Sequence, residues 1–131
     1  MPYQFSDDEW DQIFEAGLDY LERLARAEGD CSYTDFCNQL RVTCGVAPEP
    51  HSDACSQLLR RIAEETFDSH GVVVTALVHY KDGGIEPGPG FFDLCHRLRL
   101  IEAAPYSDDR KMVIVTEQVR MVIDAYSRRR T

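Results

Sequence analysis

The chain has 131 residues, of which 44% are hydrophobic and 28% charged, and its formal net charge is −9. This length fits one domain with its own hydrophobic core, which we place over residues 1–131. No apolar run approaches the roughly 18 residues that span a bilayer, and the polar, acidic start does not resemble a signal peptide. Together with an odd number of cysteines, five, these features predict a cytoplasmic protein with reduced thiols and no membrane association.

The first segment is expected to form an acidic amphipathic helix over residues 6–27. Ser6 and Glu9 match a capping box, apolar residues follow at helical spacing, and Gly29 is expected to end the helix. Residues 1–30 hold nine acids and two bases, whereas residues 31–131 hold fourteen acids and twelve bases. The acidic side of this helix therefore suits either solvent or a basic partner.

Two further helices are predicted in the middle of the chain. Thr34 is expected to cap a short helix over residues 35–42, and Ser52 a longer one that ends near residue 69. Gly71 follows the longer helix in the position typical of a helix end. Two prolines and a glycine make residues 44–51 a loop.

The second half begins with residues 72–80 (VVVTALVHY), whose β-branched, almost continuously apolar pattern predicts a strand covered on both faces. Glycine and proline then predict a loop over residues 81–90 and a helix over 91–100. Ser107 is expected to cap a long helix over residues 108–128, because its apolar residues, Met112 among them, keep a spacing of three and four. The rival interpretation is a strand at residues 111–115, with Thr116 capping a shorter helix.

Three segments within residues 33–90 resemble a winged-helix module. More narrowly, they resemble the DNA-binding half of the alkylguanine-DNA alkyltransferases and their catalytically inactive relatives. Residues 33–37 (YTDFC) stand where that family has TYGELA, residues 53–63 (DACSQLLRRIA) where it has a recognition helix, and residues 75–84 (TALVHYKDGG) where it has PCHRV and a glycine-rich turn. The position of the family's nucleophilic cysteine falls near Thr75, and that of its intercalating arginine near Asp53. Alkyl transfer is therefore not implied.

The resemblance implies a mostly α (α+β) fold, with a winged-helix-like core over residues 33–100, a small β element and a long C-terminal helix. Residues 72–98 (VVVTALVHYKDGGIEPGPGFFDLCHRL) also resemble a strand–PGxGFF–helix segment of small uncharacterised bacterial and phage proteins. That second resemblance supports the fold and implies no chemistry.

The sequence contains no complete catalytic or metal-binding constellation, so we expect no enzyme activity, cofactor or metal. Cys95 precedes His96, but it lies on the apolar side of its helix and is interpreted as a core cysteine. The remaining cysteines lack the closely spaced pairs typical of zinc sites. His79 could act as a base with Asp82 and Glu86, although a structural role is favoured.

The expected function is binding without catalysis. A nucleic acid, bound by a regulator or accessory protein, ranks slightly ahead of a protein partner, because the resemblance favours DNA whereas the acidic surface favours a protein. A second contact region is expected in the glycine-rich loop. The expected contact residues are Arg60, Arg61, Lys81, Arg97, Arg110 and Lys111, with Gly84, Pro87, Gly88 and Gly90 in the loop.

Overall fold

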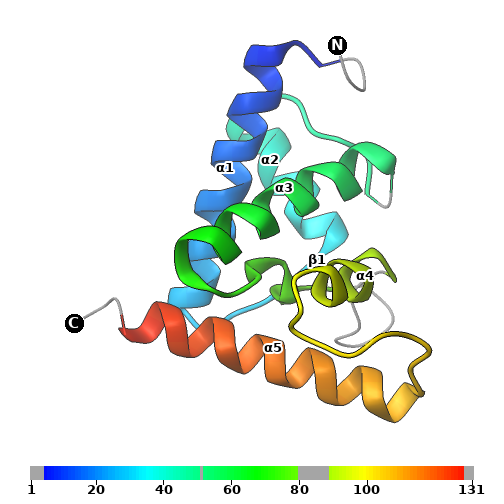
Figure 1. The fold of residues 1–131 in the computed structure, drawn as a ribbon. Helices are drawn as coiled ribbons and strands as arrows, with labels where there is room; N and C mark the ends of the chain where they lie inside the picture. The colour runs from blue at the N-terminus through cyan, green and yellow to red at the C-terminus, as the bar shows by residue number, and fades with distance from the viewer. Residues whose placement is uncertain (1–4, 51, 80–88, 129–131) are drawn as a thin grey trace.

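The computed structural model describes residues 5–50, 52–79 and 89–128, which are mostly α-helical with a small β element (Figure 1). No helix within these ranges is long and apolar enough to cross a membrane. The elements in chain order are α1 (Asp7–Arg26), β1 (Cys31–Ser32), α2 (Tyr33–Cys44), α3 (Asp53–His70), the 3-10 helix η2 (Val74–Leu77), β2 (Val78–His79), α4 (Pro89–Arg97) and α5 (Asp108–Arg128).

The predicted capping box at the start of α1 is confirmed. The Glu9 backbone N–H donates to Ser6 Oγ at 3.0 Å, and the Ser6 N–H donates to Glu9 Oε1 at 2.9 Å. The other end differs from the expectation, since Glu28 rather than Gly29 adopts the left-handed conformation, with φ 57°. The Gly29 N–H then donates to the Leu24 carbonyl at 2.8 Å, which closes the helix.

The start of α2 was predicted wrongly, because Ser32 rather than Thr34 caps this helix. Ser32 Oγ accepts a hydrogen bond from the Asp35 N–H at 3.0 Å, and Thr34 lies inside the first turn. The reason is tertiary, since Ser32 belongs to β1 and its extended backbone (φ −83°, ψ 166°) is the conformation that a cap residue needs. Strand pairing therefore determines where this helix begins.

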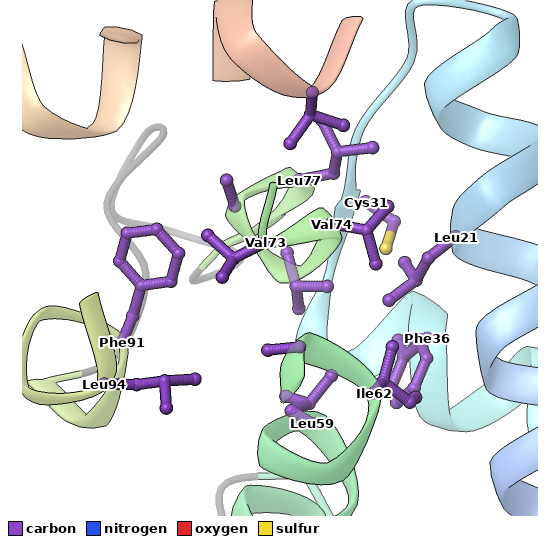
Figure 2. Packing of buried hydrophobic residues seen from close by; sticks show 14 of the residues in the cluster. Leu21, Cys31, Phe36, Leu59, Ile62, Val73, Val74, Leu77, Phe91 and Leu94 are labelled. Carbon is purple, nitrogen blue, oxygen red and sulfur yellow. The ribbon is translucent and has the colours of Figure 1, made fainter. Parts of the chain in front are cut away.

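The strand predicted over residues 72–80 was wrong for most of its length. Val74–Leu77 form η2, and only Val78 and His79 pair with Cys31 and Ser32, in parallel. Burial was predicted correctly, since residues 72–78 are all buried. Figure 2 shows why, with Val73 on the side of Phe91 from α4 and Val74 on the side of Leu21 from α1.

The ends of α3 confirm the predictions, whereas α4 and α5 each correct one. Ser52 caps α3, and Gly71 ends it with φ 74°. α4 stops at Arg97, short of residue 100, because Arg99 takes a left-handed φ of 62°. α5 is the predicted long helix, so the rival strand at residues 111–115 was wrong. The predicted apolar residues from Val115 to Tyr126 do face the core, but Met112 is 58% exposed and Ile114 is buried instead.

All five α-helices of the described chain contribute side chains to one hydrophobic cluster. The 3-10 helix η2 lies at its centre and packs against α1, α3 and α5. α2 packs mainly on α1, and α5 runs past the ends of the other elements (Figure 1).

Candidate binding site

Arg60 and Arg61, predicted on the helix that resembles a recognition helix, lie on α3 beside carboxylates. Arg61 Nη2 is 3.2 Å from Asp11 Oδ1 of α1, and the Arg61 guanidinium carbon is 4.0 Å from the centre of the Phe14 ring. Arg60 Nε is 3.9 Å from Glu64 Oε2, one turn further along α3. Exposed ion pairs of this kind are worth about 0–1 kcal/mol. Such weak ion pairs do not hold the arginine side chains in place, but the carboxylates neutralise the charge of the arginines locally.

α3 as a whole carries four acids and two arginines, so its exposed side is negative even before its neighbours are considered. A helix that binds DNA through phosphates gains affinity by displacing cations from the nucleic acid, which requires a positive surface. The local charge of α3 therefore opposes phosphate contact.

Arg97 and Arg110 lie on two other helices, and each has a carboxylate of its own. Arg97 Nε is 3.3 Å from Asp93 Oδ2, within α4. Arg110 Nε and Nη2 donate to the two oxygens of Glu102 at 2.6 and 2.7 Å. The hydrogen bonds from Arg110 are the main reason that the pKa of Glu102 is lowered to about 2. This forked pair ties the first turn of α5 to the segment that precedes it.

Two further predicted contact residues are described by the structure. Lys111 is half-buried, with Nζ 5.9 Å from the centre of the Phe92 ring. Gly90 is exposed in the first turn of α4, with no atom within 4 Å of the place where a Cβ would stand. The predicted arginines are thus divided among three helices rather than gathered on one. Four more predicted contact residues lie outside the described ranges: Lys81, Gly84, Pro87 and Gly88.

Cys95, the sequence's candidate nucleophile, is fully buried. Burial raises the pKa of its thiol to about 12, so the thiolate that would react is scarce. The interpretation as a core cysteine is confirmed. Within the ranges that the structure covers, no group of three or more His, Cys, Asp or Glu side chains is placed to hold a metal ion.

His79, the other candidate, lies at the end of β2 with Nε2 3.1 Å from Asp30 Oδ1. Asp30 immediately precedes β1, so this contact links the two short strands at their ends. Asp82 and Glu86, the acids expected beside His79, lie outside the described residues. The contact between His79 and Asp30 therefore holds the ends of the two strands together.

A cleft of about 240 Å³, which was not predicted from the sequence, lies between α1 and the C-terminal half of α3. Glu22 of α1 lines it, and its Oε2 accepts a hydrogen bond from the Tyr126 hydroxyl of α5 at 2.7 Å and lies 3.4 Å from His70 Nε2 of α3. Glu22 and Tyr126 are 104 positions apart in the chain, so no local pattern could have revealed this cluster. The lining residues are Leu18, Glu22, Arg26, Glu65, Thr66, Ser69 and His70.

The two helices that border this cleft also carry exposed carboxylates that no cation neutralises. Asp8 and Glu15 lie on α1, and Glu65 and Asp68 lie on α3. None of the four has an ion-pair partner among the described residues, whereas Asp11, on the same helix as Asp8 and Glu15, is paired with an arginine. Asp8 and Glu15 are seven positions apart on α1, and Glu65 and Asp68 are three apart on α3, so each pair lies on one side of its helix. We call these four carboxylates the acidic face.

Comparison with known proteins found no matching protein family, no similar curated protein and no similar solved structure.

Proposed function

We propose that this chain is a binding protein without catalytic activity, and that it binds a protein partner through the acidic face of α1 and α3. One contrast carries the proposal. The four predicted arginines that the structure describes each lie beside a carboxylate, whereas the four carboxylates of the acidic face have no cation of their own among the described residues. The acidic face therefore presents uncompensated negative charge to a partner.

Electrostatics favours a protein partner over a nucleic acid. An exposed ion pair is weak enough to be exchanged for a phosphate contact, so the pairs alone do not forbid DNA binding. The net charge of −9 works against it, however, because like charges repel at long range and slow the encounter. The same field attracts a basic protein surface and speeds its association.

The protein arm of the test uses a photoreactive amino acid placed at Ser69, an exposed residue that lines the cleft beside Glu65, in extract of the native host cells. We expect it to capture one partner protein, and capture to weaken when Glu65→Lys reverses a charge of the acidic face. Glu117→Lys reverses an exposed charge on α5 and is the matched control, which should capture the partner as the wild type does. Capture that is equally strong with both variants would contradict the proposal.

The nucleic-acid arm is a fluorescence anisotropy titration of duplex DNA with the wild-type chain. The proposal predicts no binding at about 50 mM salt, where phosphate contacts are strongest. Micromolar affinity that falls steeply between about 50 and about 200 mM salt would overturn the proposal and favour the DNA-binding alternative.

A further inference from the structure

Two buried cysteines meet between α2 and α3. Cys37 Sγ of α2 lies 3.8 Å from Cys55 Sγ of α3, and the two residues are 0% and 1% exposed. All five cysteines are in the reduced form, and none is joined in a disulfide. The two thiols are 18 positions apart in the chain, so a bond between them would close a short loop containing the end of α2 and the start of α3.

We propose that Cys37 and Cys55 form a reversible disulfide that ties α2 to α3 when the protein meets a low-molecular-weight disulfide such as oxidised glutathione. The thiolate of one cysteine attacks oxidised glutathione, which breaks its S–S bond and releases one glutathione as a thiolate. The second cysteine then attacks the mixed disulfide and releases the other glutathione. The two cysteines lose two electrons and two protons, and oxidised glutathione becomes two glutathione thiols.

The geometry permits this bond after a small movement. The sulfurs must approach from 3.8 Å to about 2.05 Å. α2 packs mainly on α1 and makes few contacts with α3, so the approach of the two sulfurs is opposed chiefly by the contacts between α2 and α1. Phe36, Cys37 and Leu40 are the buried residues of α2, and an opening of this helix must release them.

Burial makes the exchange slow in the closed protein. The hydrogen bond with Cys55, together with burial, raises the pKa of the Cys37 thiol, so little thiolate is present. Oxidised glutathione also has no path to sulfurs that are 0% and 1% exposed. The disulfide therefore forms only when α2 opens locally. Because the bond persists after α2 closes, its presence shows that the opening took place.

The experiment incubates the full chain with oxidised glutathione, with and without about 2 M urea, followed by alkylation of the remaining thiols. Digestion after arginine and before aspartate places the cysteines at positions 31, 37, 44 and 55 in four separate peptides, residues 30–34, 35–41, 42–52 and 53–60. We expect a linked pair of peptides 35–41 and 53–60, formed faster in urea and separated by dithiothreitol. The oxidised protein should melt roughly 5–10 °C higher than the reduced one, because the bond restricts the unfolded chain.

Three variants make the result specific. Cys37→Ala and Cys55→Ala should each abolish the linked pair, whereas Cys44→Ser, which removes the half-exposed thiol at the end of α2, should leave it intact. The proposal is overturned if Cys37 and Cys55 are alkylated separately in urea with no linked peptide. It is also overturned if linked peptides join Cys44 instead, or if the 37–55 bond leaves the melting temperature unchanged.

Discussion

Ser32 caps the start of α2, although Thr34 is also a residue type that suits this role. Ser32 and Thr34 are both good cap residues, and the hydrogen bond to the Asp35 N–H assigns the role to Ser32. Ser32→Ala should therefore lower the free energy of unfolding by about 1 kcal/mol, since the Asp35 N–H loses its acceptor. Thr34→Ala is the matched control and should change it by less than about 0.5 kcal/mol. Urea denaturation measures both, and an equal loss in the two variants would contradict the assignment.

Glu102 offers a test of the forked pair with Arg110. Its pKa in the folded protein is lowered from an ordinary 4.5 to about 2. Because the folded value is the lower one, the ionised carboxylate stabilises the fold above pH 4.5, and that contribution is lost as the pH falls toward 2. A carbon-13 NMR titration should give a midpoint near 2 for Glu102 and a return toward 4.5 in Arg110→Gln.

Arg97→Gln removes a different arginine, which pairs with Asp93 of α4, and is the control for that titration. It should leave the Glu102 midpoint where it is. A midpoint near 4.5 in the wild type would show that the pair with Arg110 does not form in solution.

At the scale of elements, the sequence predicted what is local. Ser6, Ser52 and Gly71 act within one turn of their own helix, so a pattern of a few residues was enough to locate them. The strand prediction for residues 72–80 failed because all the side chains of residues 72–78 are buried, so hydrophobicity there has no period that separates a strand from a 3-10 helix. Arg99 is a similar case, since nothing in its type indicates a left-handed residue that ends α4.

The close approach of α1 to α2 and α3 at Gly17 leads to an element-scale prediction. A Cβ at Gly17 would lie 2.9 Å from Ile62 Cδ1 and 3.1 Å from Phe36 Cζ. Gly17→Ala gains about 1 kcal/mol in helix propensity, but overpacking costs about 1–3 kcal/mol. We therefore expect a net loss of up to about 2 kcal/mol in unfolding free energy. Repeating the substitution in Ile62→Val, which removes Cδ1, should bring the loss to about zero.

Gly90→Ala is the control for this pair, because no atom lies within 4 Å of its Cβ position in α4. It should not lower stability in either background. The packing explanation fails if Gly17→Ala causes the same loss whether residue 62 is Ile or Val.

At the scale of the whole molecule, the surface proposed for binding was harder to predict than the fold. The sequence showed the acidity of the first helix and the cations along the chain, but not which cations the acids would neutralise. Arg61 meets Asp11 across 50 positions, and Glu22 meets Tyr126 across 104. Such pairs exist only after α1, α3 and α5 have packed together, so the charge left exposed on these helices could not be read from the sequence.

The hydroxyl of Tyr126 allows the packing of α1, α3 and α5 to be tested by the removal of one atom. Its hydroxyl donates to Glu22 Oε2 at 2.7 Å, and its ring packs edge-on against His70, with ring centres 5.1 Å apart. Tyr126→Phe keeps the ring and removes one hydrogen bond to a charged acceptor, which should lower the free energy of unfolding by about 2 kcal/mol. Hydrogen exchange should also quicken at the C-terminal ends of both α1 and α5, because the contact joins them.

Tyr106→Phe is the matched control, since the Tyr106 hydroxyl donates at 2.7 Å to the neutral backbone carbonyl of Glu102 at an exposed site. A loss below about 1 kcal/mol is expected there, because water replaces the lost partner. If Tyr126→Phe costs no more than Tyr106→Phe, or if exchange quickens in α5 alone, the cluster does not couple the first helix to the last. The acidic face would then rest on a junction weaker than the one inferred from the structure.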